Sequence, residues 1–147
     1  MNKWIIVSSK TGSNFYEYEG TGNGLKKVKS LENPEGKLKN SDLYSDNPGK
    51  AVSQGSGQFA MANEVDAKTK VVEKFAKEIA KELGNARKAN SFSRLIMVSE
   101  PGFMGQILKE LDDKTSSLIY HKLNKDLYHM PEKEIHESLK DVLSVQI

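Results

Sequence analysis

The chain opens with an uninterrupted apolar run and continues with a more polar, alternating pattern. Residues 4–7 (WIIV) are all apolar, as in a short strand that is buried on both faces. Residues 15–19 (FYEYE) alternate tyrosine with glutamate, and lysines dominate residues 25–31. The glycine-rich residues 20–24 between them fit a hairpin turn, because no helical pattern follows as in a phosphate-binding loop. We predict a central strand followed by a hairpin, whose lysine-bearing strand lies at an exposed edge.

The second half of the chain has the pattern of helix, strand, helix, strand, helix. Its first helix has apolar residues at three- and four-residue spacing, which form one buried face: Val72, Phe75, Ala76, Ile79 and Leu83. This helix is predicted to end near residues 84–87. Residues 94–99 and 118–123 are the two predicted strands. Pro101 and Pro131 stand at the first turns of the other two helices.

This order of elements predicts an α/β fold that is built on one mixed sheet. A three-strand meander followed by right-handed crossovers gives about five strands, with helices on the faces of the sheet. The first and fourth strands are expected to lie side by side at the centre, as in ribonuclease H-like folds. The 147 residues (1–147) fit a single domain. A long loop is predicted at about residues 33–63, where Gly, Pro, Ser, Asn and Asp leave no apolar periodicity.

The composition narrows the class of protein. Hydrophobic residues make up 37% of the chain and charged residues 29%, which is typical of a soluble protein. The chain has no cysteine, and no apolar stretch is long enough for a signal peptide or a membrane span. We therefore expect a cytoplasmic protein without membrane insertion. A net charge of +2 does not by itself indicate a partner, and the sequence leaves the oligomeric state open.

The ends of the central strands offer hydroxyl groups and one acid. The first strand ends in Ser8 and Ser9, and the fourth ends in Ser99 and Glu100. One carboxylate cannot hold the two divalent ions of a ribonuclease H-type nuclease, and no glycine-flanked elbow surrounds any of the serines. The histidines lie on a predicted strand, loop and helix without the spacing of a metal site: His121, His129 and His136. We predict no metal and no cofactor.

A stripe of lysines is the most regular polar feature of the chain. Four lysines of the helix that contains Phe75 fall on the side opposite its apolar face: Lys70, Lys74, Lys77 and Lys81. Phosphate backbones bind such stripes, but the glutamates at positions 73, 78 and 82 flank this one. Two interpretations stand: a solvated helix face without a specific partner, or a ridge that faces nucleic acid.

Five segments, taken together and in order, resemble the bacterial host attachment protein family. They cover essentially the whole chain: residues 33–36 (NPEG), 45–50 (SDNPGK), 75–80 (FAKEIA), 94–105 (RLIMVSEPGFMG) and 125–129 (KDLYH). The name of the family records a phenotype and not a chemistry. Its last segment contains a polar cluster, Lys125, Asp126 and His129, in which Asp126 can pair with either neighbour or cap a turn.

That family in turn is similar to the middle domain of class 1 release factors of the eukaryotic and archaeal type. In that domain a Gly-Gly-Gln loop precedes a long helix. Gly57 and Gln58 match the last two motif residues, Ser56 stands at the first glycine, and Gly55 precedes it. The resemblance implies hydrolysis of the peptidyl-tRNA ester, in which the glycine allows close approach and the glutamine orients a water. The lysine stripe would then face RNA.

Two functional hypotheses follow from these resemblances. In the first, the protein associates with the ribosome or tRNA, and any enzymatic activity is peptidyl-tRNA ester hydrolysis through the Gly55–Gln58 loop. The chain has no room for codon-reading or factor-recruiting domains, so a complete stop-codon-dependent release factor is not expected. In the second, the loop is a plain flexible connection, and the protein is a non-catalytic interaction protein that influences attachment to host cells through a protein partner.

Overall fold

One five-stranded mixed sheet forms the centre of the molecule. The structure is a computed structural model that describes residues 2–18, 24–37 and 57–143. The strands are β1 (Lys3–Ser9), β2 (Gly12–Tyr18), β3 (Leu25–Glu32), β4 (Arg94–Ser99) and β5 (Ile119–Asn124), in the spatial order β3-β2-β1-β4-β5. The β1–β2 and β2–β3 pairs are antiparallel, whereas β1–β4 and β4–β5 are parallel. The predicted α/β class, the hairpin and the central β1–β4 pair are confirmed, and the order is compatible with a ribonuclease H-like fold.

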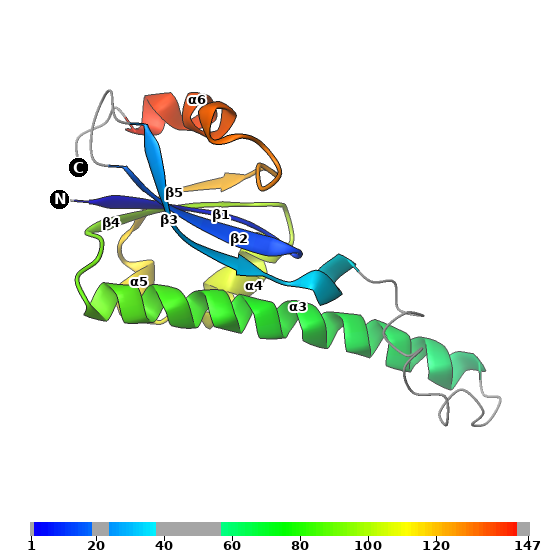
Figure 1. The fold of residues 1–147 in the computed structure, drawn as a ribbon. Helices are drawn as coiled ribbons and strands as arrows, with labels where there is room; N and C mark the ends of the chain where they lie inside the picture. Colours follow the sequence, from blue (N-terminus) through cyan, green and yellow to red (C-terminus); the bar gives the residue numbers. More distant parts are fainter. Residues whose placement is uncertain (1, 19–23, 38–56, 144–147) are drawn as a thin grey trace.

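The helices cover the two faces of the sheet unequally. Figure 1 shows α3 (Gly57–Lys88), α4 (Phe103–Glu110) and α5 (Asp113–Ser116) on one face and α6 (Glu132–Leu143) on the other. A single turn of 3-10 helix, η1 (Pro34–Lys37), follows β3. The described helices include none that is long and apolar enough to cross a membrane.

Described elements occupy both ends of the segment that the sequence predicts to be a loop, residues 33–63. The η1 turn lies inside its first part, and α3 begins at Gly57 rather than after Asn63. The first turns of α3 run beyond the sheet (Figure 1), and the apolar spacing from which a helix was predicted begins only at Val72. At its other end, α3 continues to Lys88, one residue past the predicted limit. The short α5 was not predicted, because four residues carry no periodic signal.

Two cores, one on each face of the sheet, follow from the alternation of side chains along the strands. Trp4 and Ile6 of β1 point toward α3 and α4, whereas Ile5 and Val7 point toward α6. All four side chains are buried, as expected for the continuous apolar run of a central strand. The long helix α3 is thereby fixed to the sheet by its apolar face, and its opposite face is directed away from the core.

Candidate functional site

The serines at the ends of β1 and β4 are buried, and their hydroxyl groups have separate hydrogen-bond partners. Ser8 of β1 lies beside Ser99 of β4 in the parallel register, and both are fully buried. The Ser8 and Ser13 hydroxyl oxygens are 2.7 Å apart, and the Ser99 hydroxyl donates to the Glu100 carbonyl oxygen at 3.1 Å. These hydroxyl groups satisfy one another and the backbone, as buried polar groups do.

A tightly held turn connects the end of β1 to β2. The Ser9 Oγ accepts the Thr11 backbone N–H at 3.1 Å and lies 2.8 Å from the Thr11 hydroxyl oxygen. The Lys10 backbone N–H donates to Glu100 Oε1 at 3.3 Å, and the Lys10 carbonyl oxygen accepts from Asn33 Nδ2 at 2.8 Å. Glu100 therefore ties the end of β4 to this turn and fixes the backbone of Lys10.

The three histidines lie on separate elements. His121 is on β5, His129 is in the following loop, and His136 is on α6, where its ring centroid lies 5.9 Å from that of Tyr18. Among the described residues, no group of three or more His, Asp or Glu side chains could hold a metal ion.

The release-factor-like motif falls at the start of the longest helix. Gly55 and Ser56 lie outside the described residues, whereas Gly57 and Gln58 are the first two residues of α3. The structure therefore gives Gly57 and Gln58 helical backbone in place of the irregular loop that we expected. They stand at the end of α3 that projects beyond the sheet (Figure 1).

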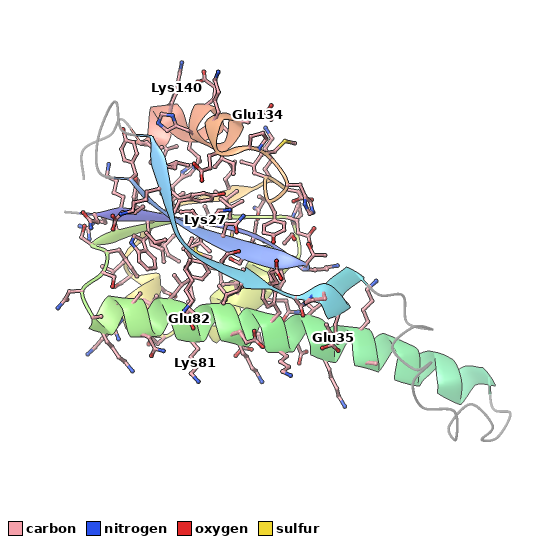
Figure 2. All side chains as sticks on the ribbon, viewed as in Figure 1. Lys27, Glu35, Lys81, Glu82, Glu134 and Lys140 are labelled. Atoms are coloured by element: carbon pink, nitrogen blue, oxygen red, sulfur yellow. The ribbon has the colours of Figure 1, made fainter. Side chains whose placement is uncertain are left out.

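We call the lysine stripe the outer face of α3 and the apolar stripe its inner face. All four lysines of the outer face are exposed: Lys70, Lys74, Lys77 and Lys81. In Figure 2, Lys81 extends from α3 away from the sheet. The flanking Glu82 turns toward the sheet instead and forms an ion pair of 2.6 Å with Lys29 of β3. The structure thus separates at least this glutamate from the lysine stripe.

The polar cluster after β5 is open and loosely organised. Lys125, Asp126 and His129 are all exposed, while Leu127 between them is buried against the α6 face of the sheet. Within the described part of the chain, no ion pair or side-chain hydrogen bond joins these three residues. The Tyr128 and His129 rings pack edge to face, with 4.9 Å between their centroids. Packing of Leu127, and not a charge pair, holds this loop.

One buried and two partly buried tyrosines pack in the core on the α6 side of the sheet. The pKa values of the Tyr16, Tyr120 and Tyr128 phenols are raised above the ordinary value for tyrosine, and burial is the main cause in each case. All three phenols therefore stay protonated at neutral pH. They can donate a hydrogen bond there but do not act as bases.

An open cavity of about 370 Å³ lies beside the turn that holds Lys10. Lys68, Thr69 and Val72 of α3 form one wall, and Gly102, Phe103 and Gln106 form the wall at the start of α4. We call it the β1–β4 cavity. Sequence reasoning missed it, although one signal was present: Lys68 lies seven residues before Phe75 and hence on the inner face of α3, where an apolar residue is expected.

The comparison with known families identifies one match that covers almost the whole chain. The family described as "Protein required for attachment to host cells" matches residues 4–139. No curated protein matches the sequence. The family match agrees with the resemblance that the five sequence segments carry.

Proposed function

Because the chain belongs to the family of proteins required for attachment to host cells, we propose that it is a non-catalytic binding protein that supports attachment through a protein partner. The observation that carries this proposal is the outer face of α3. The partner surface that fits it is acidic, since opposite charges attract across an interface and guide the partners into register.

The geometry of α3 suits a preformed binding surface. Its inner face is fixed by Phe75, Ile79 and Leu83, which are buried against the sheet and α4. The helix therefore presents its lysines on a rigid support, and binding orders only the lysine side chains. At the ends of β1 and β4, by contrast, the serines are engaged in structural hydrogen bonds.

A charge-reversal experiment tests this proposal in cells. Cells that lack the protein are complemented with the wild type or with a Lys74→Glu/Lys77→Glu/Lys81→Glu variant, and attachment to host cells is counted. We expect attachment to be lost with the variant. The matched control reverses three exposed lysines of α4 and α6, Lys109, Lys133 and Lys140, with the same change in net charge. Equal attachment with both variants would rule out the outer face as the binding surface.

A second function is favoured by the position of Gly57 and Gln58. These residues begin α3 at its projecting end, where a helix tip can enter a narrow catalytic centre. We propose, as this second candidate, that the tip promotes attack of water on the carbonyl carbon of the peptidyl-tRNA ester. The products are the free peptide acid and the tRNA hydroxyl, and Gln58 serves to orient the water.

Peptide release from ribosomes tests the second candidate. Purified protein is added to ribosomes that carry a labelled peptidyl-tRNA, and the released peptide is measured. We expect the Gln58→Ala variant to lose release and the Gln54→Ala variant to retain it. Equal release by the two variants contradicts the proposed role of Gln58.

We also propose that the protein acts in the cytoplasm, and cell fractionation tests this location. Co-sedimentation with ribosomes that disappears at high salt supports the ribosomal function, because such binding depends on phosphate contacts. Exposure at the cell surface supports direct contact with the host and contradicts the cytoplasmic location.

A further inference from the structure

The β1–β4 cavity has the position and the size of a ligand-binding site, independently of the proposed function. It lies where the carboxyl ends of the parallel strands β1 and β4 meet, the edge at which open α/β sheets bind ligands. Its volume of about 370 Å³ is within the range of small-molecule sites.

The charges that line the cavity favour an anion. Lys10 and Lys68 approach it from two different elements, and no acidic side chain is among the described residues that line it. Glu100 accepts a hydrogen bond from the Lys10 backbone N–H at 3.3 Å and is not among the residues that line the cavity. Two lysines and the Thr69 hydroxyl together supply the donors that a phosphate group requires.

The start of α4 adds backbone donors to the same site. Gly102 precedes α4 with a φ of 90°, and no side chain caps the helix. The first N–H groups of a helix favour an anion, and Gly102 and Phe103 at the start of α4 line the same cavity as the two lysines. The stacked rings of Phe75 and Phe103, whose centroids are 5.9 Å apart, fix this end of α4 against α3.

The Gln106 side chain indicates what else the ligand carries. Its Oε1 is buried and has no hydrogen-bond partner in the described part of the chain, and Gln106 lines the cavity. A buried carbonyl oxygen without a donor costs free energy, and rotation of the Gln106 side chain into the cavity would bring this oxygen to a ligand hydroxyl or amine. Val72 and Phe103 add apolar surface for the carbon skeleton.

We propose that the β1–β4 cavity is a binding site for a small organic phosphate that bears a hydroxyl or amine group. Lys10, Lys68 and the start of α4 hold the phosphate, and Gln106 accepts a hydrogen bond from the hydroxyl or amine. This assignment does not depend on the partner of the outer face of α3, because that face lies on the opposite side of the helix from the cavity.

Calorimetric titration of the full chain with glycerol phosphate tests the site, and glycerol and propyl phosphate serve as matched ligands. We expect binding of glycerol phosphate at millimolar concentration and none of glycerol. Lys68→Met should weaken binding by about tenfold or more, because a charge-assisted contact is lost, whereas Lys109→Met on the same helix as Gln106 should bind as the wild type does. Thermal unfolding of each variant confirms that it is folded.

The results that would overturn the phosphate site differ from those that would contradict the role of Gln106. No binding of glycerol phosphate, equal binding of glycerol, or equal weakening by the two lysine variants would overturn the site. The Gln106→Leu variant should still bind phosphate but lose its preference for glycerol phosphate over propyl phosphate. A preference that survives in this variant contradicts the assigned role of Gln106.

Discussion

The inner and outer faces of α3 have opposite characters on one helix. On the inner face, Phe75 is 1% exposed, and Ile79 and Leu83 are fully buried. On the outer face, Lys74, Lys77 and Lys81 are exposed. The inner face supplies stability through burial, while the outer face can change without loss of the fold. A surface with this freedom is available for binding, and the predictions below test that division.

The largest effect is expected from a truncation on the inner face. Phe75→Ala removes a buried ring that stacks on Phe103 and should lower the free energy of unfolding by about 3–5 kcal/mol. Chemical denaturation measures this change. Phe75→Leu is the control and should cost much less, because most of the volume is kept. A Phe75→Ala variant as stable as the wild type would show that the inner face does not hold α3.

A smaller loss is expected where η1 approaches the β1–β2 turn. A Cβ on Gly36 would collide with the Lys10 carbonyl oxygen, which is backbone and cannot rotate away. Gly36→Ala should therefore destabilise the protein by about 1–3 kcal/mol. Gly105→Ala in α4 is the matched control: no atom obstructs its Cβ, and it should stabilise by about 0.5–1 kcal/mol. Denaturation curves that shift in the same direction for both variants would contradict this contact.

The cap of α5 is expected to give a pH-dependent contribution. The hydrogen bond from the Thr115 backbone N–H at 2.6 Å is the main cause that lowers the pKa of the Asp112 carboxyl below its ordinary value. The stability that this hydrogen bond contributes is therefore fully present at neutral pH and is lost as the pH falls through the lowered pKa of Asp112. Asp112→Ala should cost about 1 kcal/mol at neutral pH.

Unfolding in denaturant at neutral and acidic pH measures the contribution of this cap. Asp112→Asn keeps an acceptor for the Thr115 N–H but cannot titrate, so its stability should depend less on pH than that of the wild type. A wild type and an Asn variant with the same acid dependence would exclude Asp112 as the source.

The smallest effect on stability is expected from the outer face. A Lys74→Gln/Lys77→Gln/Lys81→Gln variant should change the free energy of unfolding by only about 0.5 kcal/mol or less, because exposed charges contribute little. Thermal unfolding checks this expectation. A large loss would show that the outer face is structural, which would contradict the division between the two faces.

Much of the fold could be predicted because its signals are local. The apolar run of β1 and the spacing of Phe75, Ile79 and Leu83 each report on their own segment. Pro101 and Pro131 mark the starts of α4 and α6, but they lie just before these helices and not in their first turns. The start of α3 could not be predicted from periodicity, because the three- and four-residue apolar spacing begins only at Val72. Its residues 59–62 (FAMA) are compatible with a helix, but propensity alone is a weak guide.

The sites were harder to predict than the fold, because contacts between distant segments define them. Glu100 accepts a hydrogen bond from the Lys10 backbone N–H, ninety residues away in sequence, and no local pattern indicates that contact. The pairing of Glu82 with Lys29 depends on how α3 lies against β3. The β1–β4 cavity likewise needs three elements to meet, although Lys68 on the inner face was a visible sign.

The most direct test of the outer face as a binding surface compares a variant that lacks its positive charge with a variant that keeps it. Cells without the protein are complemented with the Lys74→Gln/Lys77→Gln/Lys81→Gln variant or with the corresponding triple arginine variant, at matched protein levels, and attachment to host cells is counted. We predict that the arginine variant restores attachment and the glutamine variant does not, because positive charge is what the partner requires. Full attachment with the glutamine variant would contradict the proposal.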